Sequence, residues 1–498
     1  MYRRIPTSLG AWLVLLISSA LPQAARSATA TLQLAPCQLE QAQRLLTVAA
    51  ECGELSVPEN RAQPKGRQIR LFVARVPAIS RQHRPDPLLL LAGGPGLGAS
   101  DFYPNVAGAF ARIHRDRDIL LVDQRGTGRS NPLSCAFDDN SMWEAGEAEI
   151  TRAMATCQQQ LAQHTDLRQF TTSVAVADLE AVRQALGYER INLYGSSYGT
   201  RVAQHYARRY PQHARALILD GVVPPQQALG PSTPLDAEQA LRQILARCRA
   251  DARCHAQFGD PLLDYQALRE QLLKKPASVT LPDPRSGKPL TLQFTHAAFA
   301  TALRLASYSA DQAALLPLAL HLAHKEGNFL PLASQFLMAT TTYGELLAYG
   351  MHNSVVCAED VPFFGTALDR PALEATFLGT AQVDALLRIC QQWPRGTVDA
   401  DLHAPLRSDV PALLLSGTAD PVTPARDGAL AAQGFRYALH LAVTGQGHGQ
   451  LGMPCMDRVM ADFLSRAEQP ATVPTVPHAC LDGIRPPPFF LTLAGPAP

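Results

Sequence analysis

The feature that most constrains the fold of this chain is a serine between two glycines, at the junction of a strand-like and a helix-like segment. Gly195-Ser196-Ser197-Tyr198-Gly199 follows the apolar run Ile191–Tyr194 and precedes a helical pattern over Thr200–Arg209. A serine in such a sharp turn has a strained backbone, and crowding by neighbouring strands leaves no room for side chains at the flanking positions. The pattern predicts that the Ser197 hydroxyl is exposed above a sheet, beside the N-terminus of a helix.

A serine hydroxyl becomes a nucleophile only when a base takes its proton, and two later segments offer the partners that this requires. Asp420 follows one strand-like run, and His448 follows the next, in a glycine-rich loop. An acid at the end of a strand can orient the imidazole of a later histidine. We therefore predict Ser197 as the nucleophile, His448 as the base and Asp420 as its partner. Asp220, at the end of an earlier strand, is the alternative acid.

Acyl transfer also needs backbone donors for the negative charge that develops on the substrate oxygen. The N–H of Tyr198, directly after the serine, is one candidate. The second should come from the loop after an early strand, where Leu88–Ala92 runs into Gly93-Gly94-Pro95-Gly96. Glycines there allow the backbone to approach a substrate closely. Gly94 is the preferred donor and Gly93 the second choice.

Seven short apolar runs are typical of strands that are buried on both faces. Helical patterns lie between several of them, and this alternation predicts a mostly parallel α/β sheet. The runs are Ile69–Val76, Leu88–Ala92, Ile119–Val122, Ile191–Tyr194, Ala216–Leu219, Ala412–Leu415 and Tyr437–Val443.

The alternation of strands and helices stops in the middle of the chain and returns near its end. From about residue 228 to 401 the pattern is mostly helical, apart from a β-like piece over Ser278–Phe294. We predict one α/β core built from residues 31–227 and 402–498, interrupted by a helical insertion over 228–401. The Pro- and Phe-rich tail from Arg485 onwards is expected to lie over the surface of the core.

The N-terminal thirty residues resemble a secretory signal peptide. Arg3 and Arg4 precede an apolar run over Leu9–Leu21, and Ala28-Thr29-Ala30 has the small-residue pattern of a cleavage site. The run is shorter than the roughly 20 residues of a membrane-spanning helix. We therefore predict that residues 1–30 are removed and that the mature protein is exported without a membrane anchor, in preference to an uncleaved tether or a lipid anchor.

The ten cysteines fit an oxidising destination, in which disulfides persist. No Cys-x-x-Cys occurs and no histidines cluster beside the cysteines, so we predict no metal site. The sequence does not determine the connectivity, but short loops favour pairs between neighbours. These pairs are Cys37–Cys52, Cys135–Cys157, Cys248–Cys254, Cys357–Cys390 and Cys455–Cys480.

The charge balance and the glycine loop exclude two other classes of function. With 44 basic and 43 acidic side chains, the chain lacks the basic excess of a nucleic-acid-binding protein. Gly94-x-Gly96-x-x-Ala99 formally fits a dinucleotide-binding fingerprint. However, Pro95 interrupts it, and no acidic residue ends a strand about 20 residues further on. We predict that no cofactor is bound.

Together these motifs resemble the prolyl aminopeptidase family of α/β-hydrolase serine peptidases, and most closely its secreted tripeptidyl-aminopeptidase-like branch. The resemblance covers nearly the whole mature length and includes the serine turn, the Gly93–Gly96 loop, the Asp123–Ser130 turn and the Asp420 and His448 loops. It implies an α/β-hydrolase fold: a mostly parallel sheet with an inserted, mainly helical cap and a TAP-like C-terminal region. One departure is Ala92, where prolyl aminopeptidases usually have histidine.

The resemblance also implies a function, namely release of residues or short peptides from a free peptide N-terminus through an acyl-enzyme. Such an enzyme needs a carboxylate for the substrate ammonium. Val356–Asp360 resembles the cap-to-core segment of the family, so Glu359 is the candidate and Asp360 the second; the alternative is that both are solvated carboxylates near a disulfide. A carboxylic-ester hydrolase with the same triad remains an alternative, as does a non-catalytic binding protein of this fold. The oligomeric state stays open.

Overall fold

The computed structural model of the chain describes residues 1–2, 32–41, 45–135, 146–284, 286–365 and 368–496. The predicted signal peptide therefore lies almost entirely outside the described residues.

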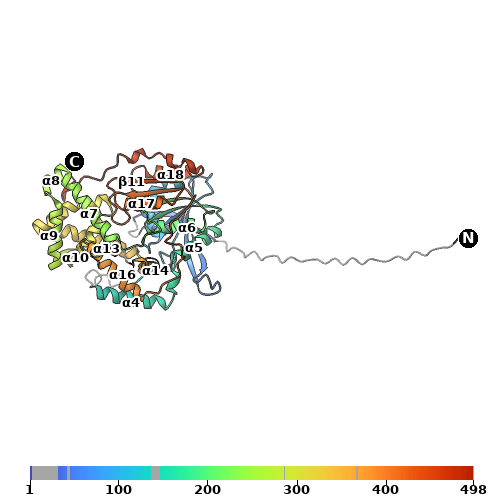
Figure 1. Cartoon of the computed structure of the whole chain (residues 1–498), viewed down its shortest axis with the longest axis horizontal. Helices are drawn as coiled ribbons and strands as arrows, with labels where there is room; N and C mark the ends of the chain where they lie inside the picture. Colours follow the sequence, from blue (N-terminus) through green and yellow to red (C-terminus); the bar gives the residue numbers. More distant parts are fainter. Residues whose placement is uncertain (3–31, 42–44, 136–145, 285, 366–367, 497–498) are drawn as a thin grey trace.

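Within the described residues, a nine-stranded sheet forms the centre of the protein, with helices on both of its faces (Figure 1). The strand order is β1-β2-β3-β5-β4-β6-β7-β10-β11. Neighbouring strands from β5 to β11 in this order pair in parallel. The pairs β1–β2, β2–β3 and β3–β5 are antiparallel. The strands are β1 (Ala35–Glu40), β2 (Thr47–Pro58), β3 (Gln68–Val76), β4 (Leu88–Leu91), β5 (Ile119–Val122), β6 (Ile191–Ser196), β7 (Ala214–Asp220), β10 (Ala412–Gly417) and β11 (Ala438–Val443).

The predicted mostly parallel sheet is confirmed, and each of the seven apolar runs coincides with a strand. The analysis of the sequence missed β1 and β2, the antiparallel strands at one edge. Most of their side chains are exposed or half-buried, so neither strand shows the continuous apolar run of a strand covered on both faces.

Helices pack on the two faces of the sheet through two separate apolar clusters. Side chains of α5, α6, α14, α16 and α17 join one cluster, and those of α1, α2 and α18 join the other. Successive residues of β4 point to opposite faces, so Leu89 and Leu91 belong to the first cluster and Leu88 and Leu90 to the second. These helices are α1 (Ala99–Val106), α2 (Ala111–His114), α5 (Thr172–Ala185), α6 (Tyr198–Arg209), α14 (Tyr349–Glu359), α16 (Ala381–Gln392), α17 (Ala425–Ala432) and α18 (Met456–Arg466).

The predicted insertion has an apolar core of its own, but only in its first part. Helices α7 to α13 and the hairpin β8–β9 surround this third cluster, whereas α14 and α16 return to the cluster of the sheet, beside α4 (Glu147–Ala162). The β-like piece predicted at residues 278–294 is thus confirmed as a hairpin. The elements are α7 (Thr233–Ala250), α8 (Ala252–Phe258), α9 (Pro261–Lys274), β8 (Ala277–Pro282), β9 (Pro289–Phe294), α10 (His296–Ala306), α11 (Ala310–Ala313), α12 (Leu316–Glu326) and α13 (Leu330–Leu346).

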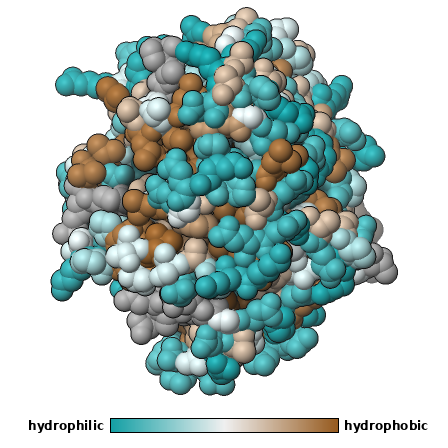
Figure 2. Space-filling model, turned by 90° about the vertical axis from the view of Figure 1, so that its left-hand side faces the viewer, coloured by the Kyte–Doolittle hydropathy of each residue, from teal (hydrophilic) through white to brown (hydrophobic). Residues whose placement is uncertain are grey.

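The outer surface of the insertion mixes polar and apolar side chains. Figure 2 views the molecule from this side, and apolar residues lie there between polar ones. Leu263, Leu273 and Met338 are among the exposed large apolar side chains. In the part of the chain that the structure describes, no helix combines the length and the apolar character needed to cross a membrane.

The C-terminal tail runs from the core onto the insertion. Pro486 lies against Gly445 in the core, and a Cβ added to that glycine would be 2.7 Å from the proline ring. The Phe489 side chain joins the apolar cluster of the insertion, with the Arg247 guanidinium 4.1 Å from its ring centroid. The expectation that the whole tail lies over the core was therefore wrong, because the phenylalanine finds its apolar neighbours in the insertion.

All five predicted disulfide pairs are confirmed, and no described cysteine is free. The paired cysteines are 6 to 33 residues apart. Cys37–Cys52 joins β1 to β2, and Cys357–Cys390 joins α14 to α16. These bonds are typical of proteins that fold in an oxidising compartment.

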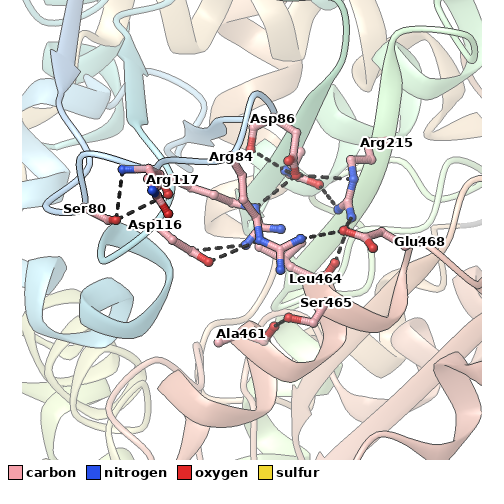
Figure 3. Close-up of polar contacts among 12 residues, drawn as sticks. Ser80, Arg84, Asp86, Asp116, Arg117, Arg215, Ala461, Leu464, Ser465 and Glu468 are labelled. Carbon is pink, nitrogen blue, oxygen red and sulfur yellow. Dashed lines mark hydrogen bonds and ion pairs between the residues drawn. The ribbon is translucent and has the colours of Figure 1, made fainter.

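A charged network fastens α18 to the end of the sheet at which the parallel strands begin (Figure 3). Asp86, just before β4, accepts a hydrogen bond from Arg117 at 3.0 Å and lies 3.3 Å from Arg215. Arg215 also donates to the carbonyl of Leu464 in α18 at 3.0 Å. Both arginines are buried, with exposed fractions of 2% and 7%. Asp86 is therefore the nearest counter-charge of two buried cations.

Removing that carboxylate is expected to destabilise the protein strongly. Asp86→Ala should lower the free energy of unfolding by about 3–5 kcal/mol, because it leaves two buried cations with only the more distant and more exposed carboxylates of Asp116 and Glu468. Urea denaturation measures the effect. Asp116→Ala is the matched control, since its side chain is 31% exposed and also pairs with Arg117, at 3.3 Å; its loss should stay below about 1 kcal/mol. Equal losses in the two variants would contradict a special role for Asp86.

Candidate active site

Ser197 lies in the sharp turn between β6 and α6, as the sequence predicts. Its backbone has φ 54° and ψ −123°, a conformation that non-glycine residues rarely adopt. Its N–H donates to the carbonyl of Asp220 at 2.8 Å, which fixes the turn against the end of β7. The side chain is half-buried, so it is held in place without being sealed from solvent.

The two flanking glycines are required by close approaches of the backbone. A Cβ on Gly195 would lie 2.4 Å from the carbonyl oxygen of Gly199, and a Cβ on Gly199 would lie 2.4 Å from that of Leu91. Neither position can therefore hold a larger residue without moving β4 or α6. Because α6 begins at Tyr198, the positive end of its helix dipole is directed at the Ser197 hydroxyl.

His448 and Asp420 form the second part of the site. The imidazole Nδ1 lies 2.8 Å from Asp420 Oδ2, and the backbone N–H of His448 donates to the carbonyl of Tyr308 at 2.8 Å. The other oxygen, Asp420 Oδ1, accepts from the N–H groups of Val422 and Thr423 at 2.8 and 2.9 Å. The carboxylate is thus fixed by the following turn, with one oxygen directed at the imidazole.

The end of β7 brings the serine and the histidine to the same place. Ser197 is bonded to Asp220, and a Cβ on the next residue, Gly221, would lie 2.9 Å from His448 Cε1. Asp220, the alternative acid, does not bind the imidazole: it accepts from the N–H of Gln450 and the hydroxyl of Tyr194, each at 2.9 Å. The geometry therefore favours Asp420 as the partner of His448.

The neighbouring carboxylates change the protonation of the imidazole. Burial lowers the pKa of His448, but the charge of Asp420 and the hydrogen bond to it outweigh burial, and the charge of Asp220 adds to them, so that the net pKa is raised. Burial raises the pKa of Asp220 itself to about 6. His448 is therefore protonated more readily than an ordinary histidine.

This shift predicts a pH profile. His448 accepts the serine proton only when it is neutral, so kcat/KM should rise with pH and reach half its maximum above about 6.5, the ordinary histidine pKa. The profile is measured with a substrate that has no titratable group in this range. A midpoint at pH 6 or below would show that the aspartate charges do not control this histidine.

The predicted oxyanion loop lies directly against the serine. A Cβ on Gly93 would be 2.9 Å from the Cβ of Ser197, so this glycine permits the contact. Gly94 has φ 111°, and a Cβ on it would be 2.7 Å from the N of Gly96. Tyr198 is the first residue of α6. All three predicted donors therefore lie on elements that contact Ser197, and the choice among them remains a prediction.

Comparisons with known proteins agree with this fold. The family described as alpha/beta hydrolase fold matches residues 86–251, and the TAP-like protein family matches residues 375–475. The chain is 27% identical over 481 residues to the serine protease Hip1 of Mycobacterium tuberculosis, covering 86% of this chain and 88% of that protein.

The chain has an α/β-hydrolase fold with a TAP-like C-terminal region. It is 32% identical over 195 residues to a tripeptidyl aminopeptidase of Streptomyces lividans, covering 36% of each protein. It is also 29% identical over 467 residues to carboxylesterase B of Mycobacterium tuberculosis, covering 86% of each. With this fold and these relatives, the protein is a serine hydrolase.

The two carboxylates predicted to bind a substrate amine lie at the end of α14 and are completely buried. Glu359 accepts hydrogen bonds from the backbone N–H and the hydroxyl of Thr172 at 2.5 and 2.7 Å. Asp360 accepts from Arg201 at 2.8 Å, and Arg201 also lies 3.7 Å from Glu359. Burial raises the pKa of Glu359 to about 7, although the charge of Arg201 opposes this. Both carboxylates have partners within the protein, and their role in binding an amine remains a prediction.

Sequence reasoning missed two residues that contact the His448–Asp420 pair and a third that contacts one of these two. The Thr423 hydroxyl donates to Asp420 at 2.9 Å and lies 3.1 Å from His448 Nδ1. The Tyr308 ring meets the His448 ring edge-on, with centroids 5.2 Å apart. Arg304 reaches the Tyr308 hydroxyl at 3.4 Å. Only Thr423 carried a signal, because it lies three residues after the predicted acid.

Proposed function

We propose that this serine hydrolase is an exported aminopeptidase that releases residues or short peptides from free peptide N-termini. The observation that carries the proposal is the His448–Asp420 pair beside the strained Ser197 turn, in a chain whose C-terminal part matches the TAP-like family. The names of two relatives, a serine protease and a tripeptidyl aminopeptidase, support a peptide substrate.

The catalytic steps follow from the placement of the side chains. Ser197 Oγ attacks the peptide carbonyl while His448 takes its proton, and Asp420 stabilises the imidazolium. The N–H groups of Tyr198 and Gly94 stabilise the oxyanion. His448 then donates its proton to the leaving amine, and the N-terminal part of the substrate stays bound as an ester of Ser197. A water molecule, activated by the same histidine, releases it.

Export is the second part of the proposal. The signal-like N-terminus supports it, and so do the five disulfides, because cytosolic thiols are kept reduced. N-terminal sequencing of the protein recovered from outside the cytoplasm tests it. A mature N-terminus near residue 31 is expected, and a protein that retains residue 1 in the cytoplasm would contradict it.

Substrate pairs test the aminopeptidase activity. A peptide with a free N-terminus should be cleaved faster than its N-acetylated form, because acetylation removes the ammonium charge. Faster cleavage of the acetylated peptide would contradict the proposal. Glu359→Gln should reduce this preference if Glu359 binds the amine; a preference that persists in the folded variant would assign amine binding to other residues.

Ester hydrolysis is the second candidate function, and the similarity to carboxylesterase B favours it. A short-chain carboxylic ester assayed beside the two peptides distinguishes the functions. We expect turnover of the free peptide to exceed background by a wide margin. Hydrolysis of the ester with no cleavage of any peptide would replace the proposed function by the second candidate.

A further inference from the structure

Arg304 is a half-buried arginine of the insertion that has only neutral partners. It lies in α10, where one terminal nitrogen donates to the Gln382 side chain at 3.2 Å and the other to the Tyr308 hydroxyl at 3.4 Å. Its Nε is buried without a hydrogen-bond partner. Throughout the described ranges, no carboxylate forms an ion pair with it.

The arginines of this protein differ in whether a carboxylate compensates their charge. Half-buried Arg247 and Arg269 resemble Arg304, since among the described residues they donate to backbone carbonyls, so the position of Arg304 also has to be considered. Burying a cation is costly unless a counter-charge is present, and in this protein the fully buried arginines have one. Each of the following five lies within 3.3 Å of a carboxylate oxygen: Arg117, Arg125, Arg183, Arg201 and Arg215. Arg304 lacks this compensation, so it is suited to an anion that comes from outside the chain.

The position of Arg304 connects it to the catalytic histidine. Tyr308, whose hydroxyl it contacts, packs its ring edge-on against His448 and accepts the backbone N–H of that residue at 2.8 Å. The charge of Arg304 also acts on His352, whose Nδ1 is 3.2 Å from the Pro95 carbonyl: burial lowers the pKa of this histidine, and Arg304 lowers it further. Through Tyr308, Arg304 is one side chain away from His448.

The chemistry decides which part of a substrate lies near this cation. His448 must protonate the leaving amine, so the leaving part of the substrate is next to the imidazole. In an aminopeptidase, that part carries the C-terminus of the peptide. A guanidinium offers a planar pair of donors that matches a carboxylate.

We propose that Arg304 is a specificity-determining residue that binds a carboxylate on the leaving part of the peptide substrate, with Gln382 and Tyr308 orienting its guanidinium. The carboxylate is either the C-terminus of a short leaving peptide or an acidic side chain close to the scissile bond. This inference rests on the proposed peptidase function.

Two pairs of peptides with free N-termini test the proposal and separate the two sources. One pair differs only in a C-terminal carboxylate or amide. In the second pair, both peptides end in an amide. One has Glu and the other Gln at the first residue of the leaving part. The wild-type enzyme should prefer the carboxylate member of at least one pair by about tenfold in kcat/KM, mainly through KM, as a charge-assisted hydrogen bond would give.

The variants show whether Arg304 causes that preference. Arg304→Gln should reduce the ratio towards one, and Arg304→Lys should keep part of it. Arg242→Gln, a matched arginine of the insertion that pairs with Glu238, should keep the wild-type ratio. A ratio unchanged in Arg304→Gln overturns the proposal, and so does an equal loss on every substrate, which would indicate that Arg304 only supports Tyr308 and His448.

Failure of the proposed function has a different result. If the wild-type enzyme cleaves none of the four peptides but hydrolyses the ester, the peptidase function is wrong and the inference falls with it. Cleavage of all four peptides at equal rates leaves the peptidase function intact and overturns the role of Arg304 alone.

Discussion

Ser197→Ala is expected to reduce kcat by about 10⁴–10⁶-fold, close to complete loss of turnover. The variant keeps the backbone turn but removes the hydroxyl that we propose as the nucleophile. No acyl-enzyme can then form, and the oxyanion donors alone give little acceleration. Labelling with a fluorophosphonate probe measures the same property directly, because the probe reacts covalently with an activated serine.

The adjacent serine provides a matched control. Ser196 is the last residue of β6 and pairs with Asp220 in the sheet, so its hydroxyl is not at the tip of the turn. Ser196→Ala should therefore still be labelled by the probe. If Ser197→Ala is labelled as strongly as the wild type, Ser197 is not the nucleophile.

Asp420→Asn is expected to reduce kcat by about 10³–10⁴-fold near neutral pH, as the corresponding change does in other serine hydrolases of this geometry. An asparagine can donate an N–H to His448 Nδ1, which would hold the proton on the wrong ring nitrogen and leave the serine without a base. It also removes the charge that raises the pKa of His448, so the pH profile should shift towards acid.

Asp220→Asn distinguishes the two acids that face the same histidine. Asp220 accepts hydrogen bonds from Gln450 and Tyr194, so its replacement should disturb the histidine loop and cost about tenfold in kcat. The decrease in kcat should remain far smaller in Asp220→Asn than in Asp420→Asn. If Asp220→Asn has the larger effect, the acid of the triad is Asp220.

Sequence reasoning could predict the core of the fold because buried parallel strands leave a clear signal. Leu88–Leu91 is apolar at every position and is covered on both faces. Most residues of β1 are exposed, and this strand was missed. The disulfides were also predictable, since every pair is formed between neighbouring cysteines.

The contact between Asp420 and His448 could be predicted because both residues follow strands and reach the same edge of the sheet. The surroundings of the carboxylates Glu359 and Asp360 could not be predicted. Glu359 is buried against Thr172 and Asp360 against Arg201, partners 187 and 159 residues away in sequence. Nothing local distinguishes such carboxylates from solvated ones. Arg304 was missed for the same reason: a helical pattern predicts α10, but not that this helix lies over His448.

The C-terminal tail ties the insertion to the loop of His448. The insertion is joined to the core at both ends of its sequence, and Phe489 anchors it a third time. A movement that lifted the insertion would have to pull Phe489 out of its cluster or carry the tail along. Because Pro486 of the tail lies against Gly445, three residues before His448, carrying the tail along would strain the loop of that histidine. The position of the proposed base is thus mechanically coupled to that of the insertion.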